Sequence, residues 1–326
     1  MSKPILSICI PTYNRADKVL KCILSSLEVV SNEIEVFVCD NGSEDDTWNV
    51  LNSIIDNRLR IIRNSVNCGF ALNLLRVVEE SKSNFVFLMS DDDLVNPKFI
   101  DSIIEERLLE SSNLGLIYGS IYSIGDKNYY SKYNDTVCRG SLAYKRCAIK
   151  HPYMSSMLFS KSEIDFERLR SYIKNEKHFM YPQEVMVLMI LNRQKEAILR
   201  SDIACYQGEP GKSFIEDETE YFNYSQRIEL VAQYIRISDD ISLNRNLSRI
   251  LYKNLADIVV QVLFDKIAWG NLKSFKLKLK KIGFYISVLK IKGVGLYLGV
   301  RFLLRVLRTS SFVKIIMKIK SLIKSS

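Results

Sequence analysis

Three consecutive carboxylates, Asp91, Asp92 and Asp93, follow the apolar run Phe85–Met89 and precede a helical segment that begins at Pro97. Like charges at such short separation repel one another, so three ionised carboxylates at one strand end require a nearby cation. Oxygen ligands suit Mg²⁺ or Mn²⁺, which usually complete their coordination shell with substrate phosphates. The structural alternative is that these acids stabilise the N-terminal dipole of the helix expected at Pro97–Ser111.

Three earlier apolar runs also end in polar clusters. These clusters are Pro11–Arg15, Asp40–Thr47 and Asn64–Gly69. Because ligands of open parallel sheets bind beyond the carboxyl ends of the strands, all four clusters are predicted to share one rim. There Asp40 would accept a hydrogen bond from a nucleobase N–H. Alternatively, Asp40 is an ordinary turn or helix-capping aspartate.

The elements that must position these clusters alternate along the first 120 residues. Strands are expected at Ile5–Ile10, Ile34–Cys39, Leu59–Arg63, Phe85–Met89 and Leu114–Tyr118, and helices at Asp17–Val30, Asp45–Ile55, Ala71–Ser81 and Pro97–Ser111. This rhythm predicts an α/β fold with a mostly parallel sheet flanked by helices. Residues 121–215 lose the rhythm and are expected to complete the same domain. Residues 216–326 are expected to form a helical C-terminal region.

The 326 residues have ordinary globular composition, and seven scattered cysteines form no C-x-x-C pair. Three of them, Cys9, Cys39 and Cys205, sit in strand-like runs, which favours reduced thiols in a core over disulfides or a zinc site. Residues 1–4 lead directly into the first strand, so we expect no secretory signal.

The positive charge is concentrated at the C-terminal end. Residues 271–326 contain fourteen Lys and Arg and no Asp or Glu, while the preceding 270 residues hold 32 basic against 37 acidic side chains. Helical spacing puts Val300, Leu303, Leu304 and Leu307 on one face and Arg301, Arg305 and Arg308 on another. Apolar runs here are too short to span a bilayer. The pattern favours an amphipathic tail on an anionic membrane surface.

Two alternatives to the membrane tail remain open. The first is an ordinary helical subdomain with a solvated basic face. The second, nucleic-acid binding, is disfavoured because the apolar face is too continuous for a phosphate-contacting surface. We therefore expect no nucleic-acid partner.

Taken together, the four polar clusters resemble the sequence pattern of a known enzyme family. The runs S-I-C-I-P-T-Y-N-R, C-D-N-G-S-E-D-D-T, N-C-G-F-A-L-N and S-D-D-D-L-V-N-P resemble, in order and spacing, the family 2 glycosyltransferases of the GT-A fold through roughly the first 120 residues. The resemblance implies a nucleotide-sugar donor carrying UDP, GDP, CDP or dTDP. It implies that residues 1–120 bind this donor and that residues 121–215 form the acceptor and catalytic half.

The same resemblance assigns roles to individual residues. Pro11, Thr12, Tyr13 and Asn14 would line the nucleoside pocket, Asp40 would bind the base, and Asn67 and Gly69 would shape the loop beside the ribose. Asp91, Asp92 and Asp93 would hold Mn²⁺ or Mg²⁺ on the diphosphate.

Two departures from the family pattern refine this. The family often has D-x-D-D, and Ser90 stands at its first position, so Asp92 is the best metal ligand, Asp93 the next, and Asp91 fills the variable place beside the donor. Asn41 replaces the second Asp of the usual D-D-G-S.

The catalytic half has fewer signals. Inverting transfer needs a general base, and Glu184 in Y-P-Q-E is the candidate, unless it is only a first-turn helix acid. The runs M-S-S-M-L-F-S-K and Y-P-Q are similar to O-antigen transferases of the abequosyltransferase type, some of which retain configuration and need no such base. Lys212, in a Gly-rich stretch, would approach the phosphates from a mobile lid.

The resulting prediction is a metal-dependent glycosyltransferase that acts on a lipid-linked saccharide in bacterial O-antigen or capsule synthesis. We expect it in the cytoplasm, peripheral on the inner face of the cell membrane. The alternatives are a sugar-nucleotide nucleotidyltransferase and a catalytically inactive membrane adaptor with the same fold.

Overall fold

The computed structural model describes residues 3–150, 153–175, 179, 181–208, 224–241, 243, 245–264, 286 and 293–309. It divides into two compact units, Met1–Ile215 and Glu216–Ser326, each of which is described by itself.

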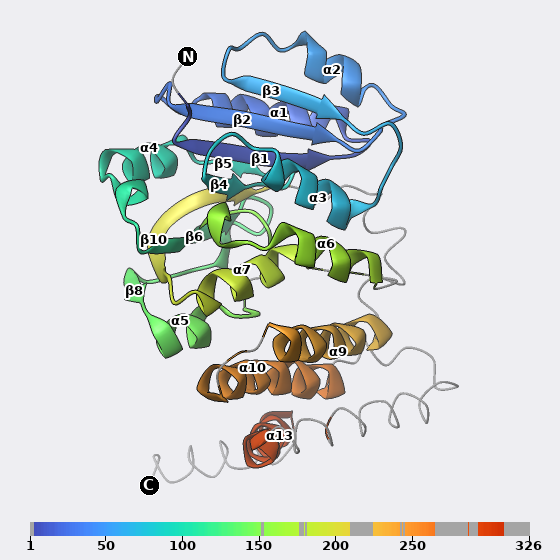
Figure 1. The fold of residues 1–326 in the computed structure, drawn as a ribbon, viewed down its shortest axis with the longest axis vertical. Coiled ribbons are helices and arrows are strands. Elements are labelled where there is room, and N and C mark those ends of the chain that lie inside the picture. Colours follow the sequence, from blue (N-terminus) through green and yellow to red (C-terminus); the bar gives the residue numbers. More distant parts are fainter. Residues whose placement is uncertain are drawn as a thin grey trace, which may run out of the picture. The chain divides into compact units, whose positions relative to one another are not determined.

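The first unit is built on one sheet (Figure 1). Within the described residues the strand order is β3-β2-β1-β4-β9-β6-β10-β5, with β7 beside β6 and β8 beside β10. The strands are β1 (Leu6–Thr12), β2 (Ile34–Asp40), β3 (Leu59–Arg63), β4 (Phe85–Leu88), β5 (Leu94–Val95), β6 (Leu114–Ser123), β7 (Asn128–Ser131), β8 (Thr136–Cys138), β9 (Met157–Ser160) and β10 (Glu196–Gln207).

The N-terminal half of the sheet is parallel, as the sequence predicts. β1 pairs in parallel with both β2 and β4, and β2 pairs in parallel with β3. The mostly parallel α/β fold class is therefore confirmed. Its helices are α1 (Ala16–Leu27), α2 (Thr47–Ser53), α3 (Phe70–Glu79) and α4 (Pro97–Glu105).

The helix expected to reach Ser111 ends at Glu105. Arg107 adopts a left-handed conformation (φ 56°), and a short 3₁₀ turn at Leu108–Glu110 follows. A left-handed residue cannot continue an α-helix.

The other half of the sheet was only partly visible in the sequence. β9 runs antiparallel to both β4 and β6, and β7 turns back along β6 as a hairpin. The helices here are α5 (Gly140–Cys147), α6 (Phe166–Asn175) and α7 (Pro182–Asn192). Sequence periodicity missed the short strands β5, β7 and β8, because two to four residues are too few to show alternation.

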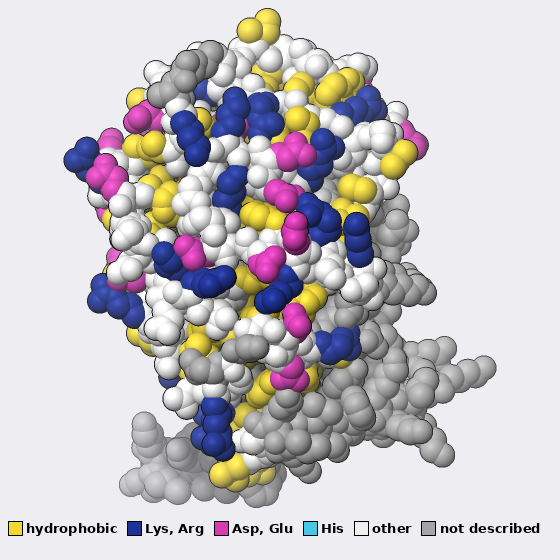
Figure 2. All heavy atoms as spheres, in the orientation of Figure 1, with side chains coloured by type: hydrophobic (Ala, Val, Ile, Leu, Met, Phe, Trp, Pro, Cys, Tyr) yellow, Lys and Arg dark blue, Asp and Glu magenta, His cyan; other side chains and the backbone are white. Residues whose placement is uncertain are grey.

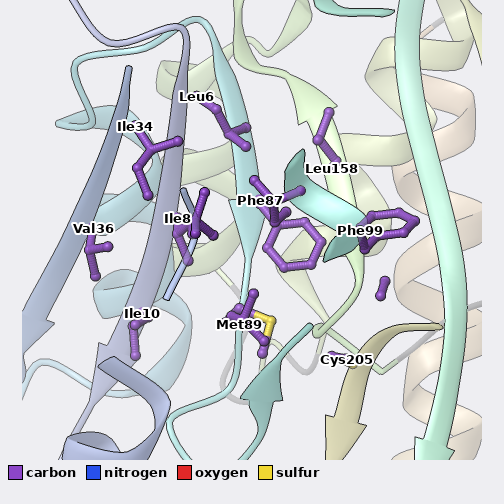
Figure 3. Packing of buried hydrophobic residues seen from close by; sticks show 14 of the residues in the cluster. Leu6, Ile8, Ile10, Ile34, Val36, Phe87, Met89, Phe99, Leu158 and Cys205 are labelled. Carbon is purple, nitrogen blue, oxygen red and sulfur yellow. The ribbon is translucent and has the colours of Figure 1, made fainter. Parts of the chain in front are cut away.

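Alternation along β1 divides the core between the two faces of the sheet. Ile8 and Ile10 pack with side chains of α1, α2 and α4, in the cluster shown in Figure 3. Cys9 points the other way, and its thiol donates to the carbonyl oxygen of Val77 in α3 at 3.4 Å. All seven cysteines are free thiols and all but Cys68 are buried, which confirms the core prediction for Cys9, Cys39 and Cys205.

The surface of the described part carries charges of both signs. On the face drawn in Figure 2, Lys and Arg side chains are interspersed with Asp and Glu. This face therefore offers no broad single-sign patch for a polyanion.

The second unit contains α9 (Tyr224–Asp240), α10 (Arg245–Phe264) and α13 (Gly295–Thr309). α13 packs on α10: the Tyr297 hydroxyl donates to Asp257 at 3.0 Å, and Arg301 Nε donates to the same carboxylate at 2.6 Å. Val294 and Leu298 are buried, whereas Leu296, Val300 and Leu303 are exposed. Among the described helices, none has the length and apolar character needed to cross a bilayer.

Candidate functional site

The predicted rim exists, because adjacent parallel strands bring their last residues into register. Thr12 of β1 pairs with Asp40 of β2, and Asp40 pairs with Arg63 of β3. On the other side of β1, Asp91 follows β4, and the Thr12 hydroxyl donates to its Oδ2 at 2.7 Å. The four polar clusters therefore lie at neighbouring strand ends.

Asp40 is fully buried at the end of β2, with its two oxygens in different situations. Oδ1 accepts hydrogen bonds from the backbone N–H and the hydroxyl of Ser43. Oδ2 lies 3.1 Å from Arg63 Nε in an ion pair but accepts no hydrogen bond from the described residues. Burying an acceptor without a hydrogen bond is costly, so Oδ2 is suited to receive a donor from a ligand.

An open cavity of about 600 Å³ lies next to the turn that follows Asp40, lined among others by Gly42, Ser43, Trp48, Arg63, Val66 and Asn67, and Asp40 itself lies behind this lining. We call it the nucleoside cavity. The Arg63 guanidinium lies 5.2 Å from the centre of the Trp48 ring and donates to the carbonyl oxygen of Ser43. Arg63 and Trp48 were not singled out from the sequence. Arg63 could have been found, because it is the last residue of the predicted strand Leu59–Arg63.

Gly42 makes the turn beside this cavity possible. Its φ is +76°, and an added Cβ would lie 3.0 Å from the backbone carbon of Val66. Both the conformation and the close approach require glycine.

An amide network holds the loop after β3. The Asn41 amide donates to Asn67 Oδ1 at 2.8 Å, and its own oxygen accepts from Asn64 at 2.8 Å and from the Cys68 N–H at 3.1 Å. Asn67 in turn accepts from the Gly69 N–H at 2.9 Å. Asn41 therefore connects the two loops. An aspartate could not do so in the same way, because a carboxylate has no N–H to donate to Asn67.

The residues after β1 are placed beside the same cluster. Pro11 and Thr12 are buried, Tyr13 is half-buried, and Asn14 is exposed in a left-handed conformation (φ 53°). The Asn14 side chain accepts from the Glu44 N–H at 2.8 Å, and its own N–H donates to the Ser43 hydroxyl at 2.8 Å. These bonds tie the end of β1 to the Asp40 turn.

The three aspartates have a cation from the protein itself. Arg15 Nη1 donates to Asp92 Oδ2 at 2.8 Å and lies 3.5 Å from Asp91 Oδ1. Arg15 therefore supplies part of the counter-charge that the sequence argument assigned to a metal ion. Among the described residues, no three His, Cys, Asp or Glu side chains gather into a group that could hold a metal ion.

Asp93 is held more completely than its neighbours. Oδ1 accepts from the Tyr153 hydroxyl at 2.8 Å and from the Gly208 N–H at 3.0 Å, and Oδ2 accepts from the Ser155 hydroxyl. Gly208 lies so close that an added Cβ would be 1.9 Å from the carbonyl oxygen of Asp92. Asp93 thus joins β10 to the acidic cluster.

Burial dominates the ionisation of this cluster. It raises the pKa of Asp91 to about 7, an effect that Arg15 opposes and Asp92 reinforces. Burial, and then the charge of Asp92, raises the pKa of Asp93 to about 6. Asp92 differs from both in keeping 18% of its side chain exposed.

Glu184 stands in the first turn of α7, as predicted, but it is only 1% exposed. Its charge acts on Tyr133 and on Cys147, which places it among these side chains. It lines neither the nucleoside cavity nor a second cavity of about 180 Å³ at β6 and β7. Lys212 lies outside the described residues.

Comparison with known proteins adds an independent result. The family profile "Glycosyl transferase family 2" matches residues 7–186. The chain is 30% identical over 116 residues to a chondroitin synthase of Pasteurella multocida, covering 35% of this chain and 12% of that protein. It is 31% identical over 119 residues to the Escherichia coli UDP-Glc:alpha-D-GlcNAc-diphosphoundecaprenol beta-1,3-glucosyltransferase WfaP, covering 36% of this chain and 46% of WfaP. The chain thus spans less than half the length of these relatives.

A solved structure resembles the chain over more of its length. The crystal structure of S. aureus TarS residues 1–349 in complex with UDP-GlcNAc has a TM-score of 0.64 at 12% identity, covering 91% of this chain and 88% of that one. At this identity the similarity establishes the fold.

Proposed function

The chain belongs to glycosyl transferase family 2, and we propose that it transfers a sugar from a nucleoside-diphosphate sugar to a saccharide acceptor. The observation that carries the proposal is Asp40 Oδ2, a buried acceptor beside a cavity of about 600 Å³, on the same rim as Asp92. A nucleoside in that cavity would direct its diphosphate along the rim towards the acidic cluster.

In this proposal Asp40 selects a base that presents an N–H. Its Oδ2 would accept that hydrogen bond, while Trp48 and Arg63 line the cavity and offer flat surfaces for the base. Pro11, Thr12, Tyr13 and Asn14 would form the adjoining wall, and the bonded Asn67 and Gly69 would fix the loop next to the ribose.

Asp92 is the residue that we propose would hold a divalent ion. Mg²⁺ is usually bound through one or two carboxylates together with substrate phosphates, so one partly exposed carboxylate fits an ion that arrives with a diphosphate. Asp93 fits less well than predicted, because it is 1% exposed, whereas Asp92 keeps 18% of its side chain exposed. The ion, Mn²⁺ or Mg²⁺, would neutralise charge on the departing diphosphate.

The proposed reaction breaks the bond between the anomeric carbon and the diphosphate oxygen and forms a bond to an acceptor hydroxyl oxygen. In an inverting reaction Glu184 would take the hydroxyl proton. In a retaining reaction, as in the abequosyltransferase type, the departing diphosphate oxygen would take that proton and Glu184 would be structural. Arg15 would balance the charge of Asp91 and Asp92 before the donor binds.

We propose a lipid-linked saccharide as acceptor, in O-antigen or capsule synthesis. WfaP is named for a diphosphoundecaprenol acceptor, and chondroitin is the product that names the Pasteurella relative. In the second unit, Leu296, Val300 and Leu303 lie on one face of α13 and are 86%, 48% and 57% exposed. Spacing of four and three residues makes them one apolar stripe, suited to the interface of an anionic bilayer.

Arg301, one of the basic residues expected to contact the membrane, is instead paired within the second unit. Arg301 is bonded to Asp257, so it supports α13 on α10. The Arg305 and Arg308 side chains and residues 310–326 lie outside the described part. We propose that the protein acts at the inner face of the cell membrane through the exposed stripe and the basic tail.

The membrane proposal is tested by flotation with vesicles containing anionic lipid. Full-length protein should float, and Leu296→Glu combined with Leu303→Glu should reduce the floated fraction. Leu142→Glu is the matched control, since Leu142 is an exposed leucine of α5 in the first unit. Equal flotation of wild type and the double variant would contradict the role of the stripe.

The transferase proposal is tested by donor hydrolysis with the full chain. UDP-, GDP-, CDP- and dTDP-sugars are first screened by thermal shift with and without Mn²⁺, because a ligand of the native state raises its stability. The sugar nucleotide that stabilises most is then assayed for release of nucleoside diphosphate. Asp92→Asn should reduce release at least tenfold, whereas Asp17→Asn, an exposed acid of α1, should not.

Three outcomes separate the alternatives. Release of nucleoside diphosphate supports the transferase. Formation of nucleoside triphosphate and sugar 1-phosphate when pyrophosphate is added would instead indicate a nucleotidyltransferase, and binding without any of these products would indicate an inactive adaptor. Unchanged release by Asp92→Asn would remove the metal assignment.

A further inference from the structure

We propose that the second cavity, at β6 and β7, binds one pyranose ring of the acceptor, an inference that rests on the proposed transferase function. The cavity measures about 180 Å³, and its walls include Tyr118, Tyr130, Tyr133, Tyr153, Ser131 and Ser156. We call it the tyrosine cavity. Tyr118, Tyr130, Ser131 and Tyr133 come from residues 118–133, a stretch rich in Tyr and Ser.

Sheet topology places the tyrosine cavity opposite the nucleoside cavity. The acidic cluster follows β4, which is central in the order β3-β2-β1-β4-β9-β6. The nucleoside cavity lies at the ends of β2 and β3, whereas the tyrosine cavity is formed by β6, β7 and the residues that precede β9. This arrangement suits a transferase, because the acceptor hydroxyl must reach the anomeric carbon of the donor, which is attached to the diphosphate at the end away from the nucleoside.

The size of the tyrosine cavity selects a single ring. An engineered protein cavity of about 150 Å³ holds one benzene molecule, so about 180 Å³ accommodates one six-membered ring with small substituents. A disaccharide would extend past the opening, where Tyr130 is 50% exposed.

The walls have the chemistry that a sugar ring requires. Tyr130 and Tyr153 have ring centroids 4.7 Å apart at 42°, and Tyr118 and Tyr133 have centroids 6.2 Å apart at 37°. Such rings present apolar faces to the C–H surface of a pyranose, and tyrosine and serine hydroxyls can bond to its hydroxyls. Lys150 adds a cationic donor to the lining.

The backbone around the tyrosine cavity is held in unusual conformations. Ser156, in the wall, has φ 72°, and Ile149, next to Lys150, has φ 54°. A β-branched residue rarely adopts this conformation, and such strain persists where surrounding structure fixes it, often at ligand sites. The cavity is therefore shaped before any ligand arrives.

Tyr153 joins the tyrosine cavity to the acidic cluster. Its ring is part of the wall, and its hydroxyl donates to Asp93 Oδ1 at 2.8 Å. A ring in the cavity is thus one side chain away from the carboxylates. An acceptor sugar held beside a donor diphosphate requires this proximity.

The test uses methyl pyranosides of glucose, galactose, N-acetylglucosamine and glucuronic acid as probes, with saturation-transfer NMR on the full chain. At least one should bind, and Tyr130→Ala should weaken it tenfold or more, with Tyr130→Phe intermediate. Tyr129→Ala is the matched control, because Tyr129 is the preceding residue of β7, is also exposed and does not line the cavity. Thermal unfolding verifies that each variant is folded.

Two results would overturn the proposal. One is that no pyranoside binds, or that Tyr130→Ala binds it as well as wild type does. The other is that a nucleotide sugar displaces the pyranoside while its nucleoside diphosphate alone does not, which would give the cavity to the donor's sugar.

Failure of the transferase proposal looks different. Donor hydrolysis by the wild-type chain is measured separately from pyranoside binding, since that reaction needs no acceptor. If wild type releases no nucleoside diphosphate but binds a pyranoside through Tyr130, the transferase proposal fails and the sugar site stands.

Discussion

Similar side chains lie at the two ends of strand β2, but at one end they support the fold and at the other they are available to a ligand. At one end Glu35 meets Arg60 of β3, whose guanidinium lies 3.4 Å from the centre of the Phe37 ring. At the other end Asp40 meets Arg63 of β3, whose guanidinium lies 5.2 Å from the centre of the Trp48 ring. Each end thus has a buried acid, an arginine and an aromatic ring.

The two ends differ in how completely the acid is satisfied. Glu35 accepts from the Ser7 hydroxyl at 2.6 Å, the Lys82 N–H at 2.9 Å and Arg60 Nε at 2.7 Å, so both of its oxygens are hydrogen-bonded. Asp40 keeps one oxygen without a hydrogen bond from the described residues, beside an open cavity. A satisfied buried acid supports the fold, whereas an unsatisfied one is available to a ligand.

The largest expected effect is on folding, at the Glu35 end of β2. Glu35→Ala should lower the free energy of unfolding by about 3 kcal/mol, because it leaves Arg60 and two further donors without their acceptor. Denaturant unfolding measures this loss, and nucleotide affinity measured below the transition should stay unchanged. A variant of wild-type stability would remove the structural half of the comparison.

The next largest effect is on nucleotide binding, at the Asp40 end of β2. Asp40→Asn should raise the Kd for the nucleotide about 10- to 100-fold, since an amide donor can replace the acceptor that the base N–H needs. Unfolding free energy should change by less than about 1 kcal/mol, because Arg63 is 39% exposed and can be solvated. Isothermal titration with the stabilising nucleotide checks this, and equal affinities would refute the role of Asp40.

A smaller effect should separate the two arginines. Arg63→Lys should weaken nucleotide binding by up to about tenfold, because lysine lacks the planar group that lies over Trp48. Arg60→Lys, three residues earlier on β3, is the matched control and should change stability instead. If both variants weaken binding equally, the two ends of the sheet are not functionally distinct.

A further expected effect is a pH dependence that originates in the acidic cluster after β4. Asp91 and Asp93 have pKa values raised to about 7 and about 6 from 3.8, mainly by burial. The native state therefore binds more protons than the unfolded state between about pH 4 and pH 7, so the free energy of unfolding should fall as pH rises through this range. Asp91→Asn should flatten this decline in ligand-free protein, and a rise of wild-type stability over this range would contradict the assignment.

Much of the parallel half could be predicted because its signals are local. Apolar runs that end in polar clusters identify β1 to β4, and parallel pairing then places Thr12, Asp40 and Asp91 on one rim without further information. The antiparallel half gave weaker signals, since β7 and β8 are only four and three residues long. Partners of such short strands are decided by distant segments.

Glu184 illustrates the limit for single residues. Its place in the first turn of α7 follows from Pro182 and the apolar run, yet its burial beside Tyr133 does not. The charge argument at Asp91–Asp93 was incomplete in the same way, because Arg15 lies 76 positions before Asp91 in the chain and meets it only in the folded protein.

From its residues alone, this protein is determined to have a parallel α/β rim with an acidic strand end and a basic C-terminal tail, because these depend on periodicity and composition. Only the tertiary structure decides which carboxylate is satisfied and which stays open. Whether a carboxylate is satisfied depends on which donors lie beside it in the folded protein, and here these donors are Arg15, Arg63, Tyr153 and Gly208. Hydrogen bonds act over a few ångströms, so the separation of two residues along the chain does not predict them.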